Sequence, residues 1–154
     1  QKNKSHIYEL LLALKKLSNY QLIITMPNAD TMGNMIREKL INFINVSNNA
    51  VGVESFGTIG YLSCMKYCEF MLGNTSSGFV EASFFPKYVI NLGDRQKGRI
   101  ITPNILNSEI TEKSILKAIE KIEVSPVIEK FKIYGNGDTA EKIFETLKMK
   151  LIVK

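Results

Sequence analysis

The sequence predicts an α/β domain built on a Rossmann-like parallel sheet with helices on both faces. Short, almost wholly apolar runs alternate with longer segments whose apolar residues recur at helical spacing. Such apolar runs are typical of parallel strands that are buried on both sides. The chain has 154 residues, 45% of them apolar, which suits one domain with its own core. We therefore expect residues 1–154 to form a single domain.

The same patterns locate the individual elements. Helices are expected over 5–17, 30–44, 58–67 and 79–85, from 111, and from 138. Strands are expected over 20–26, 50–55, 69–73 and 87–92. Pro27 ends the first strand and Pro86 ends the fourth helix, because proline lacks the amide hydrogen that either element would use. Ser5, Asp30 and Thr111 are candidate N-caps, since their short polar side chains can accept from exposed helix amides.

The charge pattern weighs against nucleic acid as a partner. The net charge is +5, but basic and acidic residues alternate along the predicted helices, as on solvated helix faces. Only residues 94–99, DRQKGR, concentrate positive charge, and their place in a predicted loop favours a small anionic ligand. No apolar run approaches the roughly 18 residues that a membrane span needs. We therefore expect no membrane partner and a cytoplasmic location.

Cysteine and histidine indicate neither a metal site nor a nucleophilic pair. Cys64 and Cys68 lie four apart in a predicted helix, a spacing that does not readily close a disulfide. We expect both to be reduced thiols. His6 is the only histidine, and its place in the first predicted helix disfavours pairing with a distant nucleophile. No metal and no cofactor are expected.

The stretch LGNTSSGFVEASFF, residues 72–85, joins a predicted strand to a predicted helix. Gly73 and Gly78 have the outer spacing of a P-loop. Phe79 and Val80, however, stand where a P-loop has its lysine and its magnesium-binding hydroxyl, so NTP hydrolysis is disfavoured.

What remains is either an anion cradle or a plain turn of small residues. Hydroxyls of Thr75, Ser76 and Ser77, with free amides at a helix N-terminus, would suit a diphosphate. Glu81, about one helical turn further on, would accept from a sugar or ribose diol. In the plain turn, Glu81 is merely solvated. This stretch alone leaves the two interpretations equal.

Two further loops favour the anion cradle. Arg95, Lys97 and Arg99 follow one predicted strand, and Asn28 and Asp30 follow another. Loops that leave the carboxyl ends of parallel strands meet at one edge of the sheet, where ligands bind in such folds. The sequence therefore predicts a site for a phosphorylated small molecule at this edge.

Four segments together resemble the C-terminal half of the hydrolysing UDP-N-acetylglucosamine 2-epimerases. They are ITMPNADTMG, SFGTIGYLSCMKYCEFMLGNTSSGFVEASFF, YVINLGDRQKGR and IYGNGDTAEKI. Each is weak alone, but the ordered set from Tyr20 to Leu147 is specific. The resemblance implies the GT-B architecture, in which two Rossmann-like domains enclose the active-site cleft. It also implies conversion of UDP-N-acetylglucosamine and water to N-acetylmannosamine and UDP, which feeds sialic acid synthesis.

The resemblance assigns the phosphate contacts to two of these segments. Thr75 and Ser76 would hold the diphosphate together with amides of the turn, and Arg95 would support the phosphates. Thr75 stands where the family usually has serine, a change that keeps the hydroxyl. Ser77 is a less certain member of this set.

The remaining UDP contacts are implied for three other places. Glu81 would bind the ribose hydroxyls, and the backbone around Phe56 and Gly57 would read the uracil edge. Asn28, from the PNAD loop, would face the UDP-sugar.

The resemblance also implies a missing partner. The chain begins just after the place where such enzymes carry an HP segment, so the N-terminal domain with its acid and base groups is expected to be absent. No catalytic residue is then expected in this chain, and the chain alone is expected to be inactive. The expected partners are UDP, a UDP-amino sugar, that N-terminal domain and, in the parent enzyme, further copies of the same subunit.

Three alternatives stay open. One is half of a relative that acts on a UDP-linked 2,4-diacetamido-trideoxy sugar. Another is half of a different GT-B enzyme, although GDRQKGR disfavours the non-hydrolysing epimerases. The third, of another class, is a stand-alone nucleotide or RNA binding module, which would need exposed aromatic residues among basic ones. Most phenylalanines and tyrosines here lie at apolar-periodic positions, which core packing explains better.

Overall fold

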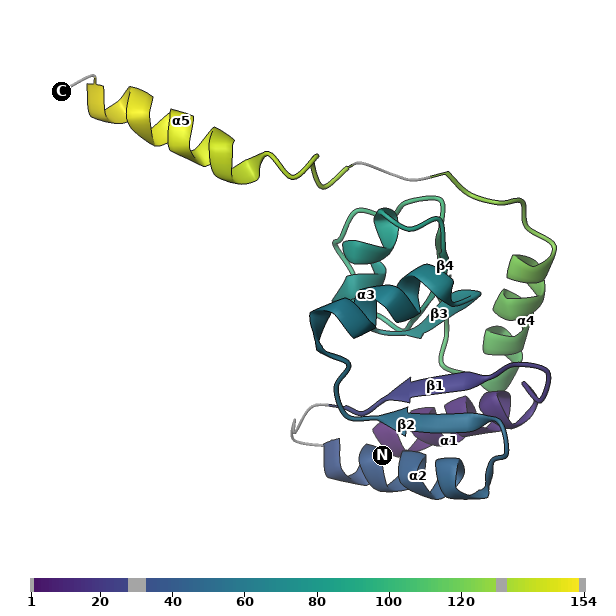
Figure 1. Cartoon of the computed structure of the whole chain (residues 1–154). Helices are drawn as coiled ribbons and strands as arrows, with labels where there is room; N and C mark the ends of the chain where they lie inside the picture. The colour runs from purple at the N-terminus through teal and green to yellow at the C-terminus, as the bar shows by residue number, and fades with distance from the viewer. Residues whose placement is uncertain (1, 28–32, 130–132, 153–154) are drawn as a thin grey trace.

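The computed structural model describes residues 2–27, 33–129 and 133–152 (Figure 1). Its α-helices are α1 (Lys2–Lys15), α2 (Gly33–Val46), α3 (Gly57–Tyr67), α4 (Glu112–Glu123) and α5 (Thr139–Ile152). Its strands are β1 (Leu22–Thr25), β2 (Ala50–Val53), β3 (Phe70–Gly73), β4 (Tyr88–Leu92) and β5 (Ile105–Ser108). Two 3₁₀ helices, η1 (Ser76–Gly78) and η2 (Glu81–Ser83), follow β3.

All pairings among the described strands are parallel, which confirms the predicted α/β class. They form two ladders, β1–β2 and β3–β4–β5, where the sequence predicts one sheet. Side chains bridge the two ladders. The ring of Tyr20, just before β1, meets the ring of Phe70 in β3 edge-on, with centroids 5.4 Å apart. Packing between side chains thus joins the ladders where backbone hydrogen bonds do not.

Strand β4 separates two apolar clusters and is buried on both faces. Ile90 and Leu92 point into the larger cluster, which α1, α2 and α4 complete. Val89 points the other way, into a cluster that includes Met65 of α3 and Phe79. Because successive side chains of a strand alternate between faces, this one strand anchors both layers of helices. Helices on both faces are therefore confirmed for the β3–β4–β5 ladder.

The β1–β2 ladder is covered on one face only. Leu22 and Ile24 pack into the larger cluster, whereas Ile23 between them is 52% exposed and Val51 of β2 is 46% exposed. The ladder thus alternates between core and solvent in the manner of a half-buried sheet, although its apolar sequence predicts burial on both sides.

The helix predicted over residues 79–85 is wrong, because the chain forms the short 3₁₀ helix η2 (Glu81–Ser83) there, soon after η1 ends at Gly78. Phe79, Ala82 and Phe85 all contact the cluster around Val89. Residues three apart eclipse one another in a 3₁₀ conformation, whereas an α-helix would rotate them progressively away from the sheet. The three-residue spacing of these apolar side chains therefore favours the tighter turns.

Two of the predicted N-caps lie within the described residues, and one of them is wrong. Ser5 lies inside α1, which begins at Lys2, so Ser5 is not its N-cap. Thr111 is confirmed as the N-cap of α4: its hydroxyl accepts from the backbone amide of Ser114 at 3.2 Å. Strand β5 is absent from the predicted elements, because its sequence ILNS is short and half polar.

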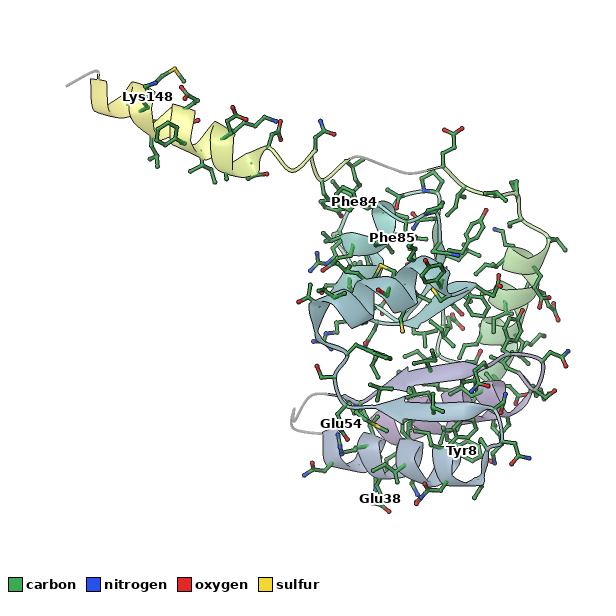
Figure 2. The ribbon with its side chains drawn as sticks, viewed as in Figure 1. Tyr8, Glu38, Glu54, Phe84, Phe85 and Lys148 are labelled. Carbon is green, nitrogen blue, oxygen red and sulfur yellow. The ribbon has the colours of Figure 1, made fainter. Side chains whose placement is uncertain are left out.

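Helix α5 extends away from the rest of the fold (Figure 1). Ile143, Phe144 and Leu147 on this helix are all exposed, and Figure 2 shows Lys148 on the same helix. An amphipathic helix normally buries its apolar face, so α5 presents an uncovered one. No helix within the described residues combines the length and apolarity that crossing a bilayer requires.

Candidate functional site

The carboxyl ends of β3, β4 and β5 lie side by side. Gly73 pairs with Asn91, and Asn91 pairs with Asn107, so the three strands end in register. Beyond them the amide of Gly93 donates to the carbonyl oxygen of Ser108 at 3.0 Å. The hydroxyl-rich turn after β3 (residues 74–78) and the basic loop after β4 (residues 94–99) therefore leave the sheet at the same edge, as the sequence predicts.

The turn after β3 is held by a chain of hydroxyl groups. The Ser77 side chain is buried, and its oxygen lies 2.5 Å from the hydroxyl oxygen of Tyr61 in α3 and 2.8 Å from that of Thr75. The Thr75 oxygen also accepts from the amide of Ser77 at 3.4 Å, which caps η1. These contacts fix the Thr75 side chain in one orientation at the start of η1.

The turn lies directly against the sheet. A Cβ atom added to Gly78 would stand 2.8 Å from Cγ1 of Val89, closer than real carbon atoms approach. Glycine is required here by the contact with β4. Ser76, two residues before Gly78, is exposed.

The predicted helix N-terminus is absent from this turn. The 3₁₀ helix η1 spans only Ser76–Gly78, too short for aligned peptide dipoles to sum to a terminal charge. A bound anion would therefore depend on the hydroxyls and local amides of the turn and on neighbouring cations.

A buried glutamine joins the turn to the basic loop. Gln96 is 8% exposed, and its Nε2 donates to the carbonyl oxygen of Asn74 at 2.6 Å. Its Oε1 accepts from Nε of Arg99 at 2.6 Å. Gly93 begins the loop with φ of 69°, a conformation that favours glycine. The basic loop is thus folded back onto the turn and fastened there.

The residues predicted to bind UDP lie in several segments of the chain. Thr75 and Ser76 share the turn, Glu81 begins η2 and is half-buried, and Arg95 is exposed in the basic loop. Among the described residues, neither Glu81 nor Arg95 has a side-chain hydrogen bond or ion pair.

The other two predicted contacts are placed less completely. Phe56 is half-buried at the N-cap position of α3, after β2, and Tyr61 on the same helix reaches the turn. Asn28 lies outside the described residues, as does Asp30 beside it.

A contact between two side-chain amides joins β4 and β5 near their carboxyl ends. Nδ2 of Asn91 donates to Oδ1 of Asn107 at 2.8 Å and to the carbonyl oxygen of Gly93 at 3.3 Å. Oδ1 of Asn91 is buried without a hydrogen-bond partner among the described residues. Buried polar groups are normally hydrogen-bonded, so this oxygen is an exception among the described residues.

Two groups with displaced pKa values lie at the opposite, amino edge of the strands. A hydrogen bond to Glu123 raises the pKa of Tyr20, before β1, to about 12, and burial adds to the effect. Burial raises the pKa of the Cys68 thiol, before β3. Neither residue belongs to the carboxyl edge, whose polar groups are suited to binding an anion.

Sequence reasoning missed Tyr61, Gln96 and Asn91 as parts of this edge. The pattern around Tyr61 indicates only a helix. In DRQKGR the charged residues indicate an anion site, but nothing in the pattern indicates a role for Gln96. A polar residue inside the apolar run YVINL was the available signal for Asn91.

Parallel strands flanked by helices, with a hydroxyl-rich turn and a basic loop at their carboxyl ends, define a Rossmann-like α/β domain, consistent with one half of a GT-B enzyme. The chain belongs to the UDP-N-acetylglucosamine 2-epimerase family, whose model matches residues 1–148. The resemblance seen in the sequence is thereby confirmed.

Curated relatives are similar over most of this chain. A GDP/UDP-N,N'-diacetylbacillosamine 2-epimerase (hydrolyzing) of Campylobacter jejuni is 44% identical over 78% of the chain and 31% of its own length. A UDP-N,N'-diacetylbacillosamine 2-epimerase (hydrolyzing) of Legionella pneumophila is 32% identical over 85% of the chain and 34% of its own length. A UDP-N-acetylglucosamine 2-epimerase of Neisseria meningitidis is 28% identical over 80% of the chain and 32% of its own length. The chain thus spans about a third of these relatives.

Proposed function

We propose that this chain is the UDP-binding part of a hydrolysing 2-epimerase that acts on a UDP-linked acetamido sugar. One observation carries the proposal: Gln96 fastens the basic loop to the turn through Asn74. That contact holds the basic loop beside the hydroxyl-rich turn. Cations next to hydroxyl donors suit the two adjacent phosphates of a nucleoside diphosphate.

In this proposal each candidate residue has a separate task. The hydroxyls of Thr75 and Ser76 donate to the diphosphate, and the Arg95 guanidinium neutralises it. Glu81 accepts from the ribose hydroxyls. Asn28 and the backbone near Phe56 complete the contacts to the UDP-sugar.

For the sugar, we favour UDP-N,N'-diacetylbacillosamine. The support is the higher identity to the relatives of that name, 44% and 32%, against 28% to the Neisseria relative named for UDP-N-acetylglucosamine. UDP-N-acetylglucosamine is the second candidate, supported by the family description. Because acid and base groups must flank the sugar, we propose that another domain of the parent enzyme supplies them.

Calorimetric titration with UDP, UMP and a short oligonucleotide tests the proposal. UDP should bind more tightly than UMP, and the double variant Ser76→Ala, Arg95→Ala should lose that preference. Lys117→Ala is the matched control, since Lys117 is an exposed cation on α4. Binding of the oligonucleotide without binding of UDP at millimolar concentration would overturn the proposal and favour the RNA-binding alternative.

An activity assay tests the division of labour. The chain alone, mixed with either UDP-sugar, should release no UDP above the uncatalysed rate. Sustained UDP release by the purified chain would place acid and base groups within it and contradict the proposal.

A further inference from the structure

The hydroxyl groups of Tyr61, Ser77 and Thr75 form a continuous chain of hydrogen bonds from α3 to the hydroxyl-rich turn. The oxygens of Tyr61 and Ser77 are 2.5 Å apart, and those of Ser77 and Thr75 are 2.8 Å apart. Each hydroxyl carries one proton and accepts through its lone pairs. Two of the three protons therefore serve the two contacts, and one proton remains for another acceptor.

The environment decides where the remaining proton lies. If both neighbours donated to Ser77, its own proton would be buried without an acceptor, which is costly. The chain therefore runs in one direction. A phenol is a stronger donor than an aliphatic hydroxyl, so the favoured direction is from Tyr61 through Ser77 to Thr75. The free proton then belongs to Thr75.

We propose that Tyr61 is a positioning residue that orients the Thr75 hydroxyl as a donor to an anionic oxygen of the ligand. In this proposal Tyr61 acts through Ser77 and Thr75 and makes no ligand contact of its own. Hydrogen bonds in a chain polarise one another, so an anion at Thr75 strengthens both inner contacts, and they in turn strengthen its binding. This inference rests on the proposed diphosphate site.

A merely structural role for Tyr61 makes a different prediction. If its hydroxyl only satisfies buried Ser77, its loss would lower thermal stability and leave the relative affinities for UDP and UMP unchanged. In the proposed arrangement Thr75 donates to the second phosphate, which UMP lacks. If Tyr61 orients Thr75, its loss would therefore reduce the preference for UDP.

The test is calorimetric titration of the 154-residue chain and its variants with UDP and UMP. Tyr61→Phe keeps the ring and removes the hydroxyl, and we expect it to weaken UDP binding about three- to tenfold, the range for one lost hydrogen bond. UMP binding should change by less. Tyr67→Phe is the matched control, because Tyr67 is an exposed tyrosine on the same helix.

A second variant shows whether Tyr61 acts through Ser77. Ser77→Ala interrupts the chain and leaves Thr75 in place, so adding Tyr61→Phe to it should weaken UDP binding no further. An additional loss in the double variant, or unchanged UDP binding by Tyr61→Phe alone, would overturn the inference while the proposed function stands. Failure of the unmodified chain to bind UDP would overturn both.

Discussion

Nε2 of Gln96 donates to the carbonyl oxygen of Asn74 across 2.6 Å, and this contact joins two loops that are 22 positions apart in sequence. The donor belongs to the basic loop after β4, and the acceptor begins the turn after β3. Because Gln96 is buried, water does not replace the contact when it is lost. The relative placement of the two loops thus depends on one neutral side chain.

Replacing Gln96 with alanine should therefore destabilise the fold and weaken UDP binding together. The change leaves the carbonyl of Asn74 and Nε of Arg99 without their partner, and we expect a loss of about 1–3 kcal/mol in the free energy of unfolding. Urea denaturation measures it. Gln21→Ala is the matched control: Gln21 also donates to a backbone carbonyl, that of Asn49, but at an exposed site. An equal loss from both variants would contradict the role given to Gln96.

Gly78→Ala should destabilise the domain by about 1–3 kcal/mol, as overpacking of a filled site does. The added methyl group would meet Cγ1 of Val89 at 2.8 Å, and valine has little freedom to rotate away. Thermal unfolding measures the loss. In a Val89→Ala background the clash disappears, so the same change at residue 78 should cost much less. Equal costs in both backgrounds would show that the contact with β4 is not the cause.

Tyr20 makes the free energy of unfolding of the domain depend on pH in the alkaline range. Its hydrogen bond to Glu123 holds the folded-state pKa at about 12, above the ordinary 10.0. The folded state therefore keeps a proton that the unfolded state releases first, and stability falls as pH rises from 10 toward 12. Below pH 10 the contribution is fully present. Denaturation at several pH values should show a steeper alkaline loss for the unmodified protein than for Tyr20→Phe, and parallel losses would contradict this assignment.

The exposed apolar face of α5 should make the chain self-associate. Ile143, Phe144 and Leu147 gather apolar surface that a second copy can cover. Light scattering at rising concentration should show dimers or larger species, and the pair Phe144→Ser, Leu147→Ser should restore a monomer. Glu145→Ser, on the same helix but charged, serves as control. A strict monomer at high concentration would exclude this behaviour.

Much of the fold follows from local sequence patterns. Apolar runs locate β1 to β4, and Thr111 marks the start of α4 because a cap depends only on residues within one turn. The conformation of residues 79–85 depends instead on the distant β4, against which Phe79 and Ala82 pack. Likewise, the division of the strands into two ladders is set by long-range packing that no local pattern contains.

The candidate site shows the same division between local and distant information. Small hydroxyl residues after a strand indicate the turn, and clustered cations indicate the basic loop. The contacts that hold these loops, through Tyr61 and Gln96, join segments 16 and 22 positions apart. Such partners become visible only when the topology brings their elements together. The roles of Glu81 and Arg95 toward UDP stay predictions.

The unequal covering of the two ladders implies a gradient of amide hydrogen exchange across the domain. Around Ile90 and Val89, β4 is enclosed on both faces, and opening its amides requires disruption of both clusters. Beside it, the ladder holding Ile23 and Val51 has one bare face and opens with less disruption. Deuterium should therefore enter β1 and β2 first and β4 last, so that the strand leading into the basic loop keeps its amide protons longest.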